Sequence, residues 1–304
     1  MKCGFIAVIG APNAGKSTLV NALVGSKVAI VSPKVQTTRM NVRGVAMRGE
    51  TQIVFVDTPG IFKPRRRLDK AMVAAAWSGA GDADAVVHLV DAAEITERPK
   101  GHAAADTDSI VESLKAGNRK AALALNKIDA MKHEALLPLA QKLDASGVYE
   151  QVFMISALKG DGLDALGAWC EGKMPEGPWL YPADQAADIP SRLLAAEITR
   201  EKIFLRLHDE LPYASAVETE RWEEKGDGSV KIDQTIYVQR DGQKAIVLGK
   251  KGATIKEIGA AARKDLEEIF GRRVHLFLFV KVRQDWADKR EHYRALGLEY
   301  PEDK

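Results

Sequence analysis

The sequence predicts an α/β domain with a mostly parallel sheet, followed by a smaller α+β domain. The length of 304 residues suits two domains of about 150 residues each. Short apolar runs alternate with amphipathic stretches through the first part of the chain, which is typical of a parallel sheet covered by helices. A proline-rich segment then precedes a different order of elements. We therefore expect domains at 1–172 and 190–304, with a linker at 173–189.

The strands expected in the first domain are short apolar runs. They cover residues 5–9, 42–47, 53–56, 85–90, 121–125 and 152–155. Helical patterns between them include residues 16–24, 68–77, 134–143 and 163–170. Because Arg48, Gly49 and Glu50 provide only a short link between the second and third strands, these two should form a hairpin. One edge strand of the sheet is therefore expected to be antiparallel.

The second domain is expected to follow the order α-β-β-α-α-β, with one further helix. A long amphipathic helix at 191–208 comes first, and two alternating segments follow it. A turn-forming sequence at 225–228 joins those segments. The expected elements after the first helix are strands at 214–222 and 230–239, a short apolar piece at 245–248, a helix at 254–270, a strand at 274–282 and a helix at 285–296.

The composition is that of an ordinary globular protein. With 46% hydrophobic and 28% charged residues, the chain can bury a sizeable core, and we do not expect wholesale disorder. No apolar run approaches the roughly 18 residues of a membrane span, and the start is too short for a secretory signal. Cys3 and Cys170 lie far apart without metal-ligand spacing, as expected of reduced thiols in a cytoplasmic protein. A net charge of +2 argues against a uniformly basic coat for nucleic acid.

Residues 10–17 have the pattern Gly-x-x-x-x-Gly-Lys-Ser, between an apolar strand and a helix. The glycines let the backbone curl around a phosphate, with amide N–H groups and the positive helix end facing the anion. Lys16 would reach the β- and γ-phosphates, and the Ser17 hydroxyl would bind Mg²⁺. We prefer this interpretation to an ordinary glycine-rich turn because the later motifs agree with it. The predicted phosphate-site residues are Gly10, Ala11, Pro12, Asn13, Ala14, Gly15, Lys16, Ser17 and Thr18.

Asp57, Thr58, Pro59 and Gly60 follow the third expected strand. An aspartate there can hold Mg²⁺ through a water molecule, and the N–H group of Gly60 can meet the γ-phosphate. Without the phosphate loop upstream, a turn cap would be the better interpretation of Asp57. In its context, the segment predicts a second part of the same nucleotide site, which also includes Ile61.

A third and a fourth motif follow the last two expected strands of the first domain. The third motif ends in Asp129, whose carboxylate can accept two hydrogen bonds from guanine, one from N1–H and one from the 2-amino group. Adenine presents an acceptor at this edge and would leave Asp129 unpaired. Lys127 can lie across the purine face, and Asn126 can tie this loop to the phosphate loop. The predicted base-site residues are Asn126, Lys127, Ile128, Asp129, Ser156 and Ala157.

These four motifs, in this order, resemble those of the translation-factor-like GTPases over residues 4–172. The resemblance implies a Ras-like P-loop GTPase fold, with GTP as substrate and Mg²⁺ as cofactor. It makes residues 36–39 the first switch, with Thr38 closing on Mg²⁺ and the γ-phosphate. The Mg²⁺ residues are then Ser17, Thr38 and Asp57. Without the neighbouring motifs, a solvated loop would be the preferred interpretation of Thr38.

Ile61 follows the second switch motif, where many small GTPases have a glutamine that orients the attacking water. Because isoleucine cannot hydrogen-bond a water, we expect slow intrinsic hydrolysis. The predicted catalytic residues are Asn13, Lys16, Thr38 and Gly60. Asn13 matches an asparagine that helps relatives with this loop to bind K⁺, so K⁺ is a candidate second cofactor that would act as a fixed positive charge.

The second domain contains a G-x-x-G loop at 249–252, between an apolar piece and an amphipathic helix. A surface turn could have this sequence, but the order of elements resembles a type II KH domain, in which such a loop clamps single-stranded RNA. Between residues 240 and 294 the chain has 14 Lys and Arg against 8 Asp and Glu, which favours phosphate contacts. The predicted RNA-binding residues are Gly249, Lys250, Lys251, Gly252, Lys256, Lys281 and Arg283.

Two further features receive non-functional interpretations. Phe277 and Phe279 alternate with aliphatic residues, and we expect both in the core rather than on a base-stacking surface. The basic run at 63–67 is expected to be a solvated, mobile switch segment rather than a nucleic-acid site.

The combination of both domains resembles the Era family of bacterial ribosome-assembly GTPases over nearly the whole chain, including the sequence Glu210-Leu211-Pro212-Tyr213. The resemblance implies GTP-dependent binding near the 3′ end of 16S rRNA, a role in 30S subunit assembly and peripheral contact with the inner membrane. A monomer without an obligate protein partner is expected. Two rivals are a tRNA-modification GTPase, which would match the first domain only, and an RNA chaperone that binds GTP but scarcely hydrolyses it.

Overall fold

The computed structural model describes residues 1–208, 211–286 and 289–302. Its contacts divide the chain into two compact units. The first comprises residues 1–29 and 38–188 with the C-terminal residues from Leu296 onward, and the second comprises 30–37 and 189–295. Residues 30–37, which include the first two residues of the expected first switch, therefore pack with the second unit.

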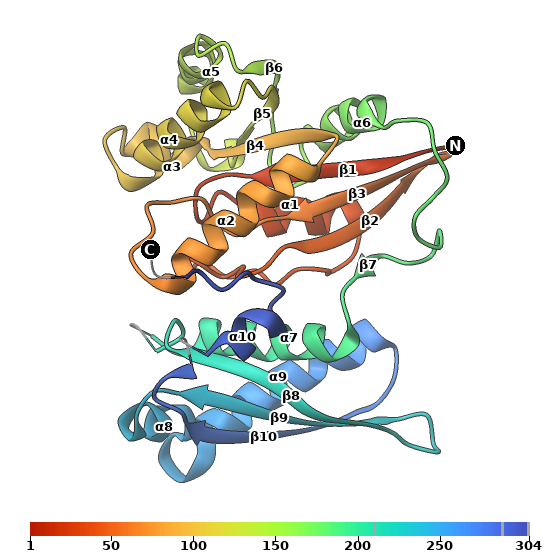
Figure 1. The fold of residues 1–304 in the computed structure, drawn as a ribbon, viewed down its shortest axis with the longest axis vertical. Coiled ribbons are helices and arrows are strands. Elements are labelled where there is room, and N and C mark those ends of the chain that lie inside the picture. Colours follow the sequence, from red (N-terminus) through yellow and green to blue (C-terminus); the bar gives the residue numbers. More distant parts are fainter. Residues whose placement is uncertain (209–210, 287–288, 303–304) are drawn as a thin grey trace. The chain divides into compact units, whose positions relative to one another are not determined.

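A seven-stranded sheet forms the first unit, in the order β6-β5-β4-β1-β3-β2-β7 (Figure 1). The central pairs β1–β3, β1–β4, β4–β5 and β5–β6 are parallel, as predicted. The strands are β1 (Lys2–Ile9), β2 (Val42–Arg48), β3 (Thr51–Asp57), β4 (Ala85–Asp91), β5 (Ala121–Asn126), β6 (Tyr149–Met154) and β7 (Ala187–Asp188).

The predicted hairpin is present, because β2 and β3 pair antiparallel. The expected linker also contributes to the sheet, since β7 pairs antiparallel with β2 through Arg43 and Gly44. The two-residue strand β7 is therefore the edge strand on this side of the sheet. We had expected β2 in that place. A strand this short carries no apolar run by which the sequence could reveal it.

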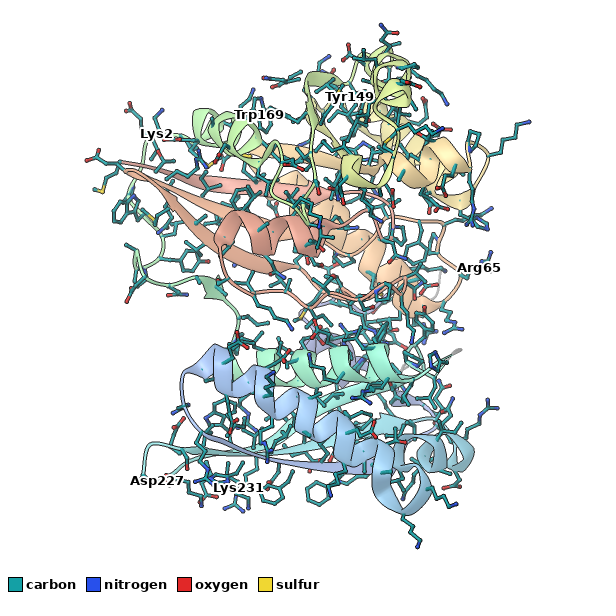
Figure 2. All side chains as sticks on the ribbon, turned by 180° about the vertical axis from the view of Figure 1, so that it is seen from behind. Lys2, Arg65, Tyr149, Trp169, Asp227 and Lys231 are labelled. Carbon is teal, nitrogen blue, oxygen red and sulfur yellow. The ribbon has the colours of Figure 1, made fainter. Side chains whose placement is uncertain are left out.

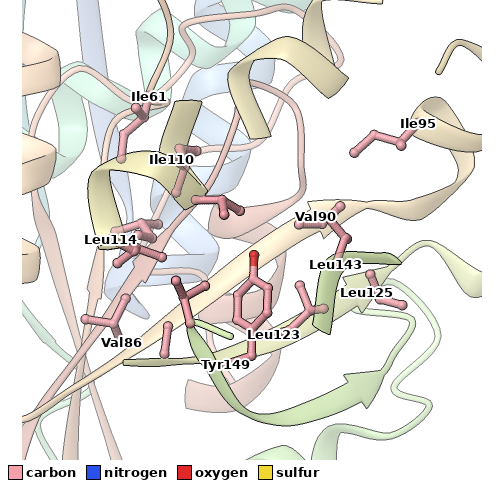
Figure 3. Close-up of a cluster of buried hydrophobic side chains, with 14 of the residues drawn as sticks. Ile61, Val86, Val90, Ile95, Ile110, Leu114, Leu123, Leu125, Leu143 and Tyr149 are labelled. Atoms are coloured by element: carbon pink, nitrogen blue, oxygen red, sulfur yellow. The ribbon is translucent and has the colours of Figure 1, made fainter. Parts of the chain in front are cut away.

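Helices cover both faces of this sheet. They are α1 (Lys16–Val24), α2 (Arg67–Asp82), α3 (Ala92–Glu97), α4 (His102–Ala116), α5 (Leu136–Asp144) and α6 (Leu163–Lys173), with short 3₁₀ turns η1 (Ile128–Ala130) and η2 (His133–Ala135). Alternate residues of β1 enter two separate cores: Ala7 and Ile9 pack with α2, α4 and α5, whereas Ile6 and Val8 pack with α1 and α6. Figure 3 shows the first of these cores.

His88 is a buried polar residue of β4. Its Nδ1 lies 2.8 Å from the hydroxyl of Tyr149, and its Nε2 has no partner among the residues that the structure describes. Burial, with a smaller contribution from the charge of Lys16, lowers the pKa of His88 to about 3. The folded protein therefore favours the neutral form of His88.

This burial makes the stability depend on pH. The folded pKa of His88 lies below its ordinary value of 6.5, so the unfolded chain takes up a proton first as the pH falls. Relative to His88→Gln, the free energy of unfolding of the wild type should fall by up to about 1.4 kcal/mol per pH unit below pH 6.5. Urea unfolding of both proteins between pH 7 and pH 4 measures this, and parallel pH profiles would contradict it.

The second unit is built on a three-stranded sheet in the order β10-β9-β8. Strand β9 pairs antiparallel with β8 and parallel with β10. The elements are α7 (Ser191–Arg206), β8 (Ser215–Glu224), β9 (Val230–Val238), α8 (Asp241–Leu248), the 3₁₀ turn η3 (Lys250–Gly252), α9 (Ala253–Phe270), β10 (Val274–Val282) and α10 (Arg290–Ala295). The predicted order is present, and the apolar piece 245–248 is the end of α8. Glu210 and part of the expected terminal helix, residues 287 and 288, lie outside the described residues.

The expectation for Phe277 and Phe279 is wrong. Their side chains are 47% and 52% exposed, whereas the alternate residues Leu276, Leu278 and Val280 pack against the core. Successive side chains of a strand point to opposite faces, and α7 and α9 pack on only one face of this sheet. An uninterrupted apolar run was therefore a poor guide to burial on both faces. Among the described residues, no helix has the length and apolar character needed to cross a membrane.

Candidate functional site

The phosphate loop lies between the end of β1 and the start of α1, and its path requires glycine at two positions. A Cβ atom on Gly10 would lie 2.3 Å from the backbone oxygen of Leu89. Gly15 has a φ of +99°, and a Cβ there would lie 2.4 Å from the side-chain amide of Asn126. The two glycines thus allow the loop to approach β4 and the predicted base-binding loop.

Lys16 is buried at the start of α1, with 6% of its side chain surface exposed. Its ammonium donates hydrogen bonds to the carbonyl oxygens of Gly10 and Ala11, at 3.1 and 2.9 Å. Burial lowers the pKa of Lys16 to about 8, although the nearby charge of Asp57 acts in the opposite direction. A positive charge held inside the loop by neutral carbonyls is well placed to bind an anion.

Ser17, Thr38 and Asp57 bring three oxygen donors together beside the loop. The Ser17 hydroxyl donates to Asp57 Oδ2 at 2.6 Å and lies 2.9 Å from the Thr38 hydroxyl, which is 3.4 Å from the same carboxylate oxygen. Asp57 is fully buried, and its Oδ1 has no partner among the described residues. Burial raises the pKa of Asp57 to about 6, against the opposing effects of Ser17, Lys16 and Thr38. Hydroxyl and carboxylate oxygens suit Mg²⁺, and the unpaired oxygen of Asp57 fits such a cation.

The second switch segment packs closely on the phosphate loop. Thr58 donates its hydroxyl to the carbonyl of Val8 at 2.8 Å, and the Ile61 amide donates to the carbonyl of Gly10 at 3.0 Å. A Cβ on Gly60 would lie 3.0 Å from the backbone of Pro12, so glycine is needed for this approach. The Ile61 side chain is 4% exposed and belongs to the core with α2 and α4, where it cannot orient a water molecule.

The predicted base-binding loop is tied to the phosphate loop through Asn126. Its amide donates to the carbonyl of Ala14 at 2.8 Å, and its side-chain oxygen accepts a hydrogen bond from the amide of Ala157 at 2.9 Å. Asp129 lies exposed in η1, with no ion pair among the described residues. Its carboxylate is free to accept hydrogen bonds from a base.

Lys127 has a partner that the sequence interpretation missed. Its ammonium lies 2.5 Å from a carboxylate oxygen of Asp91, the last residue of β4. Asp91 follows the pattern of Asp57 and Asn126, because each of these polar residues ends a strand at the same edge of the sheet. That shared position was a signal by which Asp91 could have been found.

The loop at 249–252 joins α8 to α9 in the second unit. Gly249 and Gly252 have φ values of +70° and +80°, and Lys251 between them has +53°. A Cβ on Gly249 would lie 2.1 Å from the hydroxyl of Thr254, whereas one on Gly252 would meet nothing within 4 Å. The backbone at Gly252 is thus open to close approach by a ligand.

The predicted RNA-binding cations fall into two groups. Lys250, Lys251 and Lys256 are exposed, with no acidic partner among the described residues. Lys281 instead pairs with Glu220 at 3.0 Å, and Arg283 lies 3.6 Å from Glu291. The lysines at the loop are therefore better placed to meet phosphates than the two cations of β10 and its end.

The basic run at 63–67 is mostly exposed, as its interpretation as a solvated segment requires; Figure 2 shows Arg65 at the surface. The amides of Arg65 and Arg66 donate to the carboxylate of Asp69 at 3.0 Å and so begin α2. Arg67 differs, because it hydrogen-bonds the hydroxyl of Tyr300 and stacks on its ring.

Comparison with known proteins places both units in described families. The model of the 50S ribosome-binding GTPase family matches residues 5–127, and the KH domain model matches residues 210–287. A GTPase Era from Maricaulis maris is 58% identical over 98% of this chain and 98% of its own length. The chain belongs to the Era family of GTPases. A GTPase Era from Caulobacter vibrioides is likewise 58% identical, over 98% of this chain and 97% of the relative.

Two solved structures of the family share the fold over the full length. A variant of Era from Aquifex aeolicus bound to GDP and AlF4⁻ has a TM-score of 0.89 at 40% identity, covering 98% of this chain and 99% of that chain. Era in complex with MgGDPNP and nucleotides 1506–1542 of 16S ribosomal RNA has a TM-score of 0.90 at 39% identity, with the same coverage. Because Era relatives match both units, a tRNA-modification GTPase, which would match only the first, is excluded.

Proposed function

We propose that this protein is a GTP-hydrolysing switch that binds 16S ribosomal RNA near its 3′ end and acts in assembly of the 30S subunit. The proposal rests on one observation: the same chain combines a phosphate loop, a loop suited to guanine and an open G-x-x-G loop with exposed lysines. The GTPase domain is assigned to 1–172, the linker to 173–189 and the RNA-binding domain to 190–304.

In the proposed reaction, Lys16 transfers its hydrogen bonds from the carbonyls of Gly10 and Ala11 to phosphate oxygens. Ser17, Thr38 and Asp57 would hold Mg²⁺, which neutralises charge on the phosphates. The N–H group of Gly60, close to the phosphate loop, would donate to the γ-phosphate. Since Ile61 is buried in the core and cannot hydrogen-bond a water molecule, intrinsic hydrolysis is expected to be slow.

Asn13 is the residue proposed to bind K⁺. It is an exposed residue of the phosphate loop, with a φ of +62°. A monovalent cation there would stabilise charge that develops on the transferred phosphate. Replacing Na⁺ by K⁺ at constant ionic strength should speed hydrolysis at least about tenfold, and Asn13→Ala should remove the difference. Equal rates of the wild type in both salts would disprove the role of K⁺.

The RNA site is tested by removing the two lysines of the G-x-x-G loop. Lys250→Ala with Lys251→Ala should weaken binding of an RNA with the sequence of nucleotides 1506–1542 of 16S rRNA and leave GTP affinity unchanged. The slope of log affinity against log salt should fall by about 0.7 for each phosphate that the loop no longer neutralises. Titrations at several salt concentrations, monitored by fluorescence anisotropy, measure both quantities.

A matched control removes two lysines elsewhere in the same unit. Figure 2 shows Lys231 near the β8–β9 hairpin, at the end of the sheet opposite α8. Lys225 lies in the same hairpin, and both lysines lie near acids, Glu223 and Asp233. Lys225→Ala with Lys231→Ala should leave RNA binding nearly unchanged; equal losses in the two double variants would count against the loop as the RNA site.

The cellular setting is proposed from the family resemblance. A protein that acts on ribosomal RNA works in the cytoplasm. Peripheral contact with the inner membrane and a monomeric state are also proposed from the resemblance to the Era family. Flotation with vesicles of anionic and zwitterionic lipids tests the membrane contact, and sedimentation equilibrium tests the monomer. Absence of the protein from the floated fraction would exclude direct lipid binding.

A further inference from the structure

A group of positive charges without counter-charges lies just before α2 and at its beginning, in the first unit. We call this group the basic patch, and its members are Lys63, Arg65, Arg66 and Lys70. All four side chains are exposed, and none forms an ion pair with a residue that the structure describes; Figure 2 labels Arg65. Cations on other helices of this unit differ, since Arg98 pairs with Glu94 and Lys115 pairs with Glu112.

Two carboxylates reach this segment, and both bind its backbone instead of its cations. Asp69 is buried and accepts hydrogen bonds from the amides of Arg65 and Arg66, each at 3.0 Å. Asp106 of α4 accepts a hydrogen bond from the amide of Lys63. The segment is thus anchored through its backbone, while its positive side chains remain available to a partner in solution.

Positive charge is concentrated in this segment far beyond the average of the chain. Residues 63–70 contain five Lys and Arg against a single Asp, whereas the whole chain has a net charge of +2. The fifth cation, Arg67, hydrogen-bonds the hydroxyl of Tyr300 and stacks on its ring, so it is not part of the basic patch. A local excess of one sign attracts partners of the opposite charge and speeds their association, so the partner of this patch should be an anion.

The chemistry of the basic patch favours the phosphates of RNA over a lipid surface. Two of its members are arginines, whose planar guanidinium can bind two phosphate oxygens at once. Contact with a lipid surface combines basic residues with apolar side chains that enter the membrane. No large apolar side chain among residues 60–82 is exposed. The patch is therefore suited to a phosphate backbone that stays in water.

We propose that the basic patch is a second RNA-binding site, which holds phosphates of the RNA backbone and does not read the base sequence. This inference rests on the proposed binding of 16S rRNA. A G-x-x-G loop clamps about four nucleotides, and the RNA proposed above, nucleotides 1506–1542, has many phosphates beyond them. Because phosphate contacts release counterions, the contribution of the patch to RNA affinity should fall steeply as the salt concentration rises.

The first test removes both arginines of the patch. Arg65→Ala with Arg66→Ala should weaken binding of this RNA about tenfold at low salt, and the slope of log affinity against log salt should become shallower by about 1.4. The loss should be equally large for an RNA of the same length and scrambled sequence, because phosphates carry no sequence information. GTP affinity, and GTP hydrolysis without RNA, should stay unchanged. A loss confined to the native sequence, or an equal loss of GTP affinity, would overturn the proposal.

A matched control removes two other exposed cations of the first unit. Lys120 donates to the carbonyl of Gly147, Lys142 is exposed on α5, and neither pairs with an acid among the described residues. Lys120→Ala with Lys142→Ala makes the same change in net charge and should leave RNA affinity nearly unchanged. Equal losses in the arginine pair and the lysine pair would show that only the overall charge matters, which contradicts a defined site.

Two further measurements keep the test decisive. Lys63→Ala with Lys70→Ala should weaken RNA binding in the same direction, which provides the readout if the arginine pair does not fold. Flotation with phosphatidylglycerol vesicles separates RNA from lipid: if both patch variants lose vesicle binding and keep their RNA affinity, the patch binds lipid and the proposal is wrong. If the wild type itself does not bind RNA, the proposed function fails; wild-type binding that both patch variants retain in full refutes the second site alone.

Discussion

Lys16→Met is expected to lower GTP hydrolysis by about 10²- to 10³-fold, the usual loss when one donor to a developing charge is removed. Lys16 is the buried cation of the phosphate loop, and its two present partners are neutral carbonyls. Its replacement leaves the phosphates without a fixed positive charge. Phosphate release under single-turnover conditions measures the rate, and filter binding measures the affinity for GTP.

The fold should survive this change. Because burial already disfavours the charged form of Lys16 and lowers its pKa to about 8, removing the ammonium relieves a cost of folding. The melting temperature of the nucleotide-free variant should therefore equal or exceed that of the wild type. Lys120→Met is the control, since Lys120 precedes β5 at the opposite edge of the sheet and donates to Gly147. A Lys16→Met variant with normal hydrolysis would remove the phosphate loop from the mechanism.

Asp129→Asn should change the base preference from guanine to xanthine, with a change of about 10⁴-fold in the ratio of GTP to XTP affinity. The carboxylate of Asp129 can accept hydrogen bonds from N1–H and the 2-amino group of guanine. Asparagine presents an amide donor at one of these positions, which repels the amino group and suits the 2-oxo group of xanthine. Competition of GTP and XTP against a fluorescent nucleotide measures the ratio.

The exposed position of Asp129 in η1 makes this substitution a clean probe. Asp129 forms no ion pair with any described residue, and the side chains of Asp and Asn have the same shape, so the loop should keep its structure. Asp161→Asn is a control in a neighbouring loop that should leave base preference unchanged. Retention of GTP selectivity in Asp129→Asn would place guanine recognition on other groups.

Most of the first unit followed from the sequence because its strands are contiguous apolar runs, such as the one that ends at Ile9. Strand β7 did not, since two residues carry no periodicity, and its place beside Arg43 depends on the path of the whole linker. The sequence was also a poor guide to the burial of Phe277 and Phe279, which were expected in the core and are exposed. An apolar run indicates a strand, but the number of helices packed on the sheet decides whether both faces are buried.

The sequence by itself determined the nucleotide motifs, because each one is a short stretch that follows a strand. The carboxyl ends of parallel strands meet at one edge, so Asp57 and Asn126 were expected near the phosphate loop before any distance was known. Only the tertiary structure decided that residues 30–37 pack with the second unit. Arg200 of α7 donates a hydrogen bond to the carbonyl of Thr37, 163 positions earlier in the chain, and no local pattern relates the two residues. Interactions between distant segments depend on how their helices and loops pack, and they have no counterpart in the spacing of residues along the chain.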